Sequence, residues 1–175
     1  MTENSPGNPL DRVSTLTFDI FGTVLNLAGS IVPTLEEILR SCEAHESITG
    51  TDVWSHWRQR QRIEQYQDNL LMLGHSGYLA VMKRALLYSL RTLKIEFTYE
   101  QIDELMKAYQ GLTPFQDAID GLKRLGTKYQ LVILSNGEGR YLEHLVKNRI
   151  GIDFHAILSA ELVGQFKPHP SVYRF

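Results

Sequence analysis

The chain has 175 residues, of which 43% are hydrophobic and 22% are charged, a composition that predicts one sizeable globular core with room for a small second domain. Its formal net charge of -2 lacks the basic excess that nucleic-acid binding requires, and no polybasic tract indicates a membrane surface as partner. No apolar run approaches the roughly 20 residues that span a bilayer. The polar start and the single cysteine, Cys42, predict a cytoplasmic protein without a secretory signal or an intrachain disulfide.

The first predicted strand covers residues 13–18 (VSTLTF), which are mostly β-branched or apolar. The run ends at Asp19, and Gly22 follows closely. This pattern predicts a buried strand that leads into a tight loop, with an acid at the carboxyl end of the strand.

A long helical stretch is predicted from residue 26 to residue 110. Its first part has apolar residues at the spacing of a buried helical stripe, namely Leu35, Ile38, Leu39 and Cys42. Further on, Thr98 followed by Gln101 is typical of a capping box at the start of a helix. We therefore expect an all-helical cap domain over residues 26–110, inserted into a core made of residues 1–25 and 111–175.

The chain then returns through a helix that Pro114 is expected to open and Gly126 to close. An apolar run over residues 129–134 predicts a second strand, and residues 154–158 (FHAIL) predict a weaker third one. Strands that alternate with helices indicate an α/β protein with a doubly wound, Rossmann-like parallel sheet. Ligands of such folds bind at the carboxyl ends of the strands.

The acid at the end of the first strand can be interpreted in two ways. Asp19 is followed by Gly22, which lets the backbone turn, and by Thr23, which can donate a hydrogen bond, as expected where a carboxylate nucleophile is presented. An aspartate before a glycine also commonly caps a turn without any chemical role. The other residues at this edge of the sheet must decide between the two.

Three further polar residues are predicted at the same edge. Lys167 precedes Pro168 in a loop after the third strand, where it is either a solvated lysine or an ammonium partner for Asp19. Ser135 and Asn136 follow the second strand, where they either form a turn or offer donors to a substrate anion.

One arginine of the predicted cap stands beside aromatic residues. Arg58 lies four residues after Trp54 and next to Trp57, so on a helix its guanidinium borders an aromatic face, either as packing or as an anion-binding group. Arg60 is expected to point the opposite way into solvent, and the short basic run that ends at Arg62 is too local to indicate nucleic-acid binding. No His, Cys or Glu spacing typical of a metal site is present.

Three short motifs occur in a fixed order along the chain. The first is FDIFGT, with Asp19; the second is ILSNG, with Ser135; the third is FKPHPSVY, with Lys167 and Tyr173. With the helical insertion between the first two, the chain resembles the haloacid dehalogenase superfamily over almost its whole length. Within that superfamily it resembles the L-2-haloacid dehalogenases.

The choice of subfamily depends on one position. Phosphatases of this superfamily carry a second aspartate two residues after the nucleophile, to protonate the leaving group, and here that position is Phe21. A halide leaving group needs no proton, so the resemblance implies a dehalogenase.

The resemblance also implies a role for each site residue. Asp19 would attack the carbon that bears the halogen of a short 2-haloacid, and water would cleave the resulting ester. Thr23 and Lys167 would orient or activate Asp19, and Arg58 would receive the halide. The other substrate-binding residues implied are Phe21, Gln59, Tyr78, Ser135, Asn136 and Tyr173. No cofactor is implied, and a homodimer is left open.

The family has a fourth, acidic motif after a fourth strand, and the sequence ends at Phe175 before it. We therefore expect a core that is incomplete at its C-terminus, a first strand with an open edge, and a chain that is unstable or inactive by itself. Two other functions stay open: a phosphatase-like hydrolase that requires Mg²⁺, and an inactive or binding protein.

Overall fold

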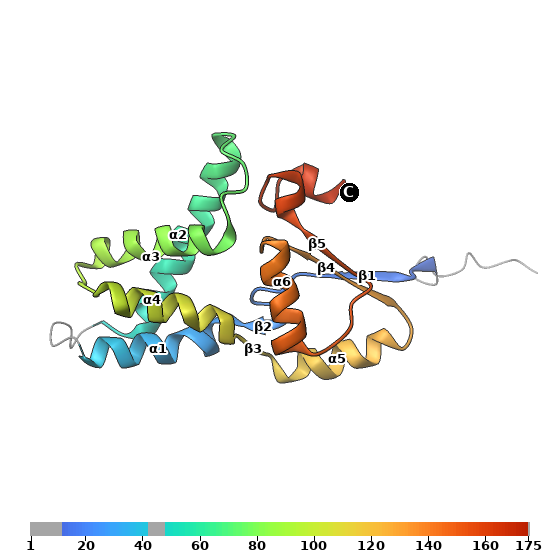
Figure 1. Cartoon of the computed structure of the whole chain (residues 1–175), viewed down its shortest axis with the longest axis horizontal. Helices are drawn as coiled ribbons and strands as arrows, with labels where there is room; N and C mark the ends of the chain where they lie inside the picture. The colour runs from blue at the N-terminus through green and yellow to red at the C-terminus, as the bar shows by residue number, and fades with distance from the viewer. Residues whose placement is uncertain (1–11, 42–47, 175) are drawn as a thin grey trace, which may run out of the picture.

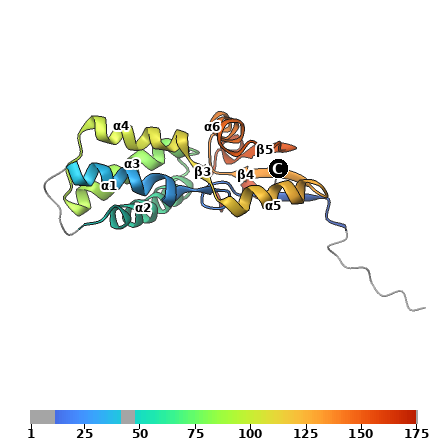
Figure 2. The same ribbon diagram turned by 90° about the horizontal axis from the view of Figure 1, so that it is seen from below.

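The computed structural model describes residues 12–41 and 48–174. The expectations for Cys42 and for the start of the chain lie outside these residues. Figures 1 and 2 show helices α1 to α4 grouped at one end of the molecule and the parallel sheet with α5 and α6 at the other. The cap is thus placed against the end of the sheet rather than over its face.

Three parallel strands make up the main sheet, in the order β1-β4-β5. They are β1 (Thr15–Phe18), β4 (Gln130–Ser135) and β5 (Ala156–Ser159). The register pairs Phe18 with Ile133, and Ser135 with Ser159. The predicted α/β class is therefore confirmed. The described strands progress in one direction from β1, as in one half of a doubly wound sheet.

The prediction that the first strand is buried is wrong. Thr15 and Thr17 are exposed, and Leu16 and Phe18 are only half-buried. Among the described residues β1 pairs with β4 alone, so its other edge is open, as expected. By contrast, Ile133 of the central strand β4 is fully buried.

A two-stranded antiparallel ribbon joins the two ends of the molecule. It consists of β2 (Leu25–Asn26) and β3 (Thr113–Pro114). The prediction that Pro114 opens a helix is wrong, because Pro114 pairs with Leu25 in this ribbon. Phe115 is also extended and donates its backbone N–H to the Val24 carbonyl, so α5 (Gln116–Gly126) begins one residue later and ends at the expected glycine.

In the described part of the helical insertion there are four α-helices. They are α1 (Leu27–Ser41), α2 (Gly50–Leu70), α3 (Tyr78–Leu93) and α4 (Tyr99–Ala108). The predicted capping box of Thr98 and Gln101 opens α4, and Thr49 with Asp52 forms a second one at α2. The remaining short helices are η2 (Tyr109–Gly111), α6 (Gly139–Leu145), η3 (Val146–Ile150), η4 (Ala160–Val163) and η5 (Pro170–Tyr173). None of the described helices is long and apolar enough to cross a membrane.

Charged residues link α2 to α3. Arg84 of α3 contacts the buried Asp68 at 3.0 Å and Glu64 at 2.9 Å, both of which lie on α2. The prediction that Arg60 is solvated is wrong: it donates to Glu64 at 2.8 Å, and its guanidinium lies 3.8 Å from the ring centroid of Tyr88. These pairs leave Glu64 and Asp68 compensated on the face of α2 that packs on α3.

The end of α2 is tied to the core loop that precedes Lys167. The side chain of Asn69 donates to the Phe166 carbonyl at 2.7 Å and accepts from the Phe166 N–H at 2.8 Å. In the loop between α2 and α3, His75 Nε2 lies 2.8 Å from the Asn136 carbonyl oxygen, and its ring lies 4.0 Å from that of Phe166. Cap and core are thus joined by side-chain hydrogen bonds as well as by the chain itself.

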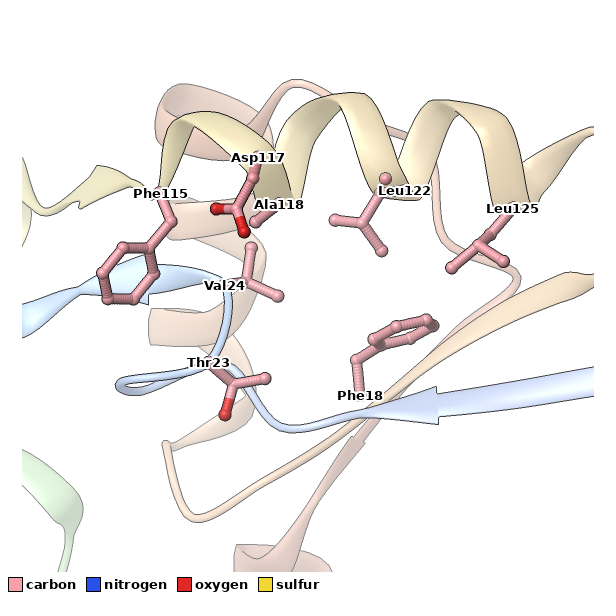
Figure 3. Close-up of a pocket in the computed structure, with 9 residues that line it drawn as sticks. Phe18, Thr23, Val24, Phe115, Asp117, Ala118, Leu122 and Leu125 are labelled. Atoms are coloured by element: carbon pink, nitrogen blue, oxygen red, sulfur yellow. The ribbon is translucent and has the colours of Figure 1, made fainter.

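An apolar hollow of about 400 Å³ lies between α5 and the end of β1. Figure 3 shows Phe18, Leu122 and Leu125 on its walls. Its few polar residues include Asp117 and Thr23, and it contains no cationic side chain. We therefore place no chemistry there.

The expected instability of the chain by itself stays a prediction.

Candidate active site

The turn after β1 presents Asp19 at the carboxyl end of the sheet. The Ile20 carbonyl accepts hydrogen bonds from the N–H groups of Val24 and Leu25, at 3.0 and 2.9 Å. Gly22 has φ = 85°, a left-handed conformation that favours glycine. The turn therefore folds back tightly and leaves the Asp19 side chain 37% exposed.

Two side chains hold the Asp19 carboxylate. Lys167 Nζ lies 2.6 Å from Asp19 Oδ1, and the Thr23 hydroxyl donates to Asp19 Oδ2 at 3.3 Å. A second hydrogen bond, from Nζ to the Leu134 carbonyl at 2.7 Å, fixes the ammonium from the side of β4. A carboxylate that only caps a turn does not need an ammonium brought from a distant loop, so the contact favours the nucleophile interpretation.

Asn136 connects this ion pair to the loop after β4. Its Oδ1 accepts the Lys167 backbone N–H at 2.6 Å, and its carbonyl contacts His75. Among the described residues, its Nδ2 has no hydrogen-bond partner. Asn136 thus positions the lysine loop and keeps one pair of donors free for a ligand.

A small cavity of about 170 Å³ opens above Asp19. It is bounded by residues of β1's loop, of α2, of the start of α3 and of the core loops, namely Asp19, Phe21, Arg58, Gln61, Arg62, Gln65, Tyr78, Asn136 and Lys167. Sites for drug-sized ligands usually measure about 300 to 1,000 Å³. This cavity is suited to a compound of only a few carbon atoms.

Aromatic rings close one side of the cavity. Phe21 and Tyr78 stack with their ring centroids 4.0 Å apart and their planes within 8°, and Tyr141 lies behind Phe21 at 5.8 Å. Burial raises the pKa of Tyr78 although the positive charge of Arg58 lowers it, so the phenol stays neutral at ordinary pH. Its hydroxyl is buried and lies beside the Arg58 side chain.

Arg58 reaches the cavity from α2. Its guanidinium lies 5.6 Å from the ring centroid of Trp54, and Nη1 donates to Gln61 Oε1. Trp57, on the same helix, is buried and donates its Nε1–H to the Met82 carbonyl of α3 at 2.7 Å. The tryptophans therefore anchor and flank α2, while the arginine lines the same cavity as Asp19.

Three residues predicted for the site do not line the cavity. Ser135 is fully buried in the sheet, paired with Ser159, and its Oγ accepts the Gly137 N–H at 3.4 Å. Gln59 is exposed, because one residue along a helix turns its side chain away from the face of Arg58. Tyr173 is 58% exposed in η5. The other predicted residues line the cavity or, as with Thr23, bind Asp19 directly.

Three cavity residues were missed by the sequence analysis: Gln61, Arg62 and Gln65. With Arg58 they stand at i, i+3, i+4 and i+7 of α2, so they share one helical face. This spacing indicates a shared helical face. The residues are polar, however, and a helical face is usually recognised from its apolar residues. Among the described residues, no group of three or more His, Cys, Asp or Glu side chains is arranged to hold a metal ion.

A family model for haloacid dehalogenase-like hydrolases matches residues 13–175. The chain belongs to the haloacid dehalogenase-like hydrolases. It is 30% identical over 168 residues to (S)-2-haloacid dehalogenase 4A of Burkholderia cepacia, an alignment that covers 95% of this chain and 69% of that protein. It is also 30% identical over 162 residues to the (S)-2-haloacid dehalogenase of Xanthobacter autotrophicus, over 92% of this chain and 60% of that protein.

Solved structures of this family have the same fold. A dehalogenase crystal structure superposes with a TM-score of 0.82 at 27% identity, covering 94% of this chain and 70% of that one. The L-2-haloacid dehalogenase of Xanthobacter autotrophicus with chloropropionic acid covalently bound superposes with a TM-score of 0.75 at 28% identity, covering 93% of this chain and 62% of that one. The chain therefore spans between 60% and 70% of the length of these relatives.

Proposed function

We propose that this protein hydrolyses the carbon–halogen bond of short 2-haloacids, with Asp19 as the nucleophile. The proposal rests on the Asp19 carboxylate, which is bound by Lys167 at 2.6 Å and by Thr23. Asp19 lines a cavity that Arg58 also lines. The covalent chloropropionate of the Xanthobacter structure and the names of the other relatives support the same reaction.

The reaction has two steps. In the first, an oxygen of Asp19 attacks carbon 2 of the haloacid, the new C–O bond forms as the C–halogen bond breaks, and the halide leaves with the bonding electron pair. In the second, water attacks the carbonyl carbon of the Asp19 ester, which releases a 2-hydroxy acid and a proton and regenerates the carboxylate. The sum is haloacid plus water giving hydroxy acid, halide and a proton.

Arg58 would stabilise the leaving halide. It is anchored beside Trp54 and bonded to the neutral Gln61, so no carboxylate among the described residues competes for its charge. The Nδ2 of Asn136, which has no hydrogen-bond partner among the described residues, would bind the substrate carboxylate. Phe21 and Tyr78 would pack against the carbon atoms and exclude water from the reacting centre.

The phosphatase alternative has no support from the site. Phe21 stands two residues after Asp19 and stacks on Tyr78, so no acid at that position can protonate an alkoxide leaving group. Halide departure requires no proton, and the proposed reaction needs no cofactor. We place the reaction in the cytoplasm because the single cysteine is consistent with a reducing compartment. A homodimer stays a prediction.

Halide release tests the proposal directly. We expect purified protein to release chloride from 2-chloropropionate, and to form lactate in equal amount, in buffer that contains EDTA. Assaying the two enantiomers separately reports which one fits the cavity. Hydrolysis of phosphate esters that requires added Mg²⁺, with no chloride release, would contradict the proposal.

A further inference from the structure

The cavity above Asp19 contains a second group of hydrogen-bond donors besides those that the proposed reaction uses. Arg62 and Gln65 stand one and two turns along α2 from Arg58 and line the same cavity. In the proposed reaction Asn136 binds the single carboxylate of a short 2-haloacid and Arg58 binds its halogen. An alkyl tail then has no acceptor for the donors of Arg62 and Gln65.

The cationic side chains of the cavity differ in whether a carboxylate is paired with them. Lys167 is paired with Asp19, and Arg58 donates to the neutral amide of Gln61 and lies beside the neutral phenol of Tyr78. Arg62 makes no hydrogen bond or ion pair with any residue that the structure describes. Two guanidinium charges therefore face the cavity without a carboxylate, and in the proposed reaction Arg58 receives the halide, which leaves Arg62 without an anion.

Gln65 adds an independent observation. Its side chain is only 4% exposed, yet its Nε2 is buried without a hydrogen-bond partner among the described residues. Buried donors in native proteins are nearly always paired, and leaving one unpaired destabilises the fold. Gln65 lines the cavity, so a half-turn of its side-chain amide would present this donor to a ligand acceptor there.

We propose that the preferred substrate is a short dicarboxylic 2-haloacid, whose second carboxylate binds between Arg62 and Gln65. This rests on the proposed function and specifies its substrate class. Arg62 is exposed at the mouth of the cavity and Gln65 lies deeper, so the second carboxylate would accept from a guanidinium on one side and from an amide on the other. The volume of about 170 Å³ limits the carbon chain between the two carboxylates to a few atoms.

An alkyl tail in the same place would be rejected. It would leave the Gln65 amide unpaired and would bring an apolar group beside the Arg62 charge, and sites built to hydrogen-bond a substrate group discriminate strongly against analogues that lack it. The discrimination should therefore be larger than the gain from adding or removing a methylene group in an apolar pocket.

The test compares 2-chlorosuccinate with 2-chlorobutyrate, which has the same number of carbon atoms and no second charge. We expect kcat/KM for chloride release to be about 10- to 100-fold higher for 2-chlorosuccinate, mainly through KM, because hydrogen bonds to charged groups contribute this much. The preference should shrink as salt is added, since Arg62 is exposed. Equal or faster turnover of 2-chlorobutyrate would overturn the proposal.

Binding of acids that carry no halogen tests the site for the second carboxylate independently of the reaction. At equal concentrations, succinate should raise the melting temperature more than butyrate does. If no haloacid is turned over, the proposed function fails, and this comparison still decides the binding site: equal stabilisation by the two acids would overturn it.

Two variants locate the effect. Arg62→Leu should reduce the preference for 2-chlorosuccinate to near unity, whereas Arg91→Leu, which removes an exposed arginine of α3 outside the cavity, should keep it. Gln65→Leu should also reduce the preference, and because it removes an unpaired buried donor it should raise the melting temperature, by about 2 to 4 °C. An unchanged preference in both cavity variants would overturn the proposal.

Discussion

Replacing Asp19 by asparagine is expected to reduce halide release by about 10⁴-fold or more, as loss of a nucleophile does in other enzymes that use covalent catalysis. The amide has almost the same shape as the carboxylate but is a poor nucleophile, and it gives up the ion pair with Lys167 at 2.6 Å. Because the Asp19 side chain is 37% exposed, the fold should persist. Chloride release and a thermal melt, measured on the same sample, check both statements.

Asp117→Asn is a matched control. Asp117 is also an exposed aspartate of the core, but it lines the apolar hollow beside α5 and contributes nothing to the proposed cavity. This variant should retain wild-type turnover.

A second measurement uses water labelled with heavy oxygen and enzyme in excess of substrate. The label should enter the peptide that contains Asp19 before it enters the product. Substantial activity in Asp19→Asn would return Asp19 to the role of a turn residue.

Replacing Arg58 by lysine is expected to lower kcat by about 100-fold although the charge is kept. The guanidinium is planar, lies 5.6 Å from the Trp54 ring centroid, donates to Gln61 and lines the cavity. An ammonium on a flexible chain cannot hold this arrangement. Chloride release at saturating 2-chloropropionate measures the effect.

Product inhibition gives a second check on Arg58. If this residue receives the halide, added chloride should inhibit the wild-type protein more strongly than Arg58→Lys. Arg91→Lys serves as the control, since Arg91 is exposed on α3 and does not line the cavity. Wild-type kcat together with unchanged chloride inhibition in Arg58→Lys would mean that the arginine only packs on Trp54.

The sequence predicted the features that depend on local rules. The capping box of Thr98 and Gln101 forms as expected, because both of its hydrogen bonds are made within one turn. The Asp19 carboxylate and Lys167 meet because the parallel strands β1 and β5 end at the same edge of the sheet, and the Lys167 side chain reaches past the end of β4 to Asp19. In both cases the geometry follows from spacing and strand direction alone.

Other features depend on contacts between residues that are far apart in the sequence, which local rules do not predict. Pro114 was assigned to a helix because proline favours the first helical turn, but pairing with Leu25 places it in a ribbon. Arg60 was assigned to solvent because it does not share the face of Arg58, yet Tyr88 and Glu64 cover it once α3 packs on α2. Ser135 is predicted to offer its hydroxyl to a substrate anion because it follows the second strand, whereas the sheet buries its side chain.

The two hydrogen bonds between Asn69 and Phe166 have a consequence for how the protein loses activity. They fasten the far end of α2, the helix that carries Arg58, to the residue before Lys167, and His75 adds a contact to Asn136. Local unfolding of either segment would release the other, so the two belong to one cooperative unit. A partly opened molecule would therefore lose the ammonium and the guanidinium together, and conditions that loosen the cap would inactivate the protein before its sheet unfolds.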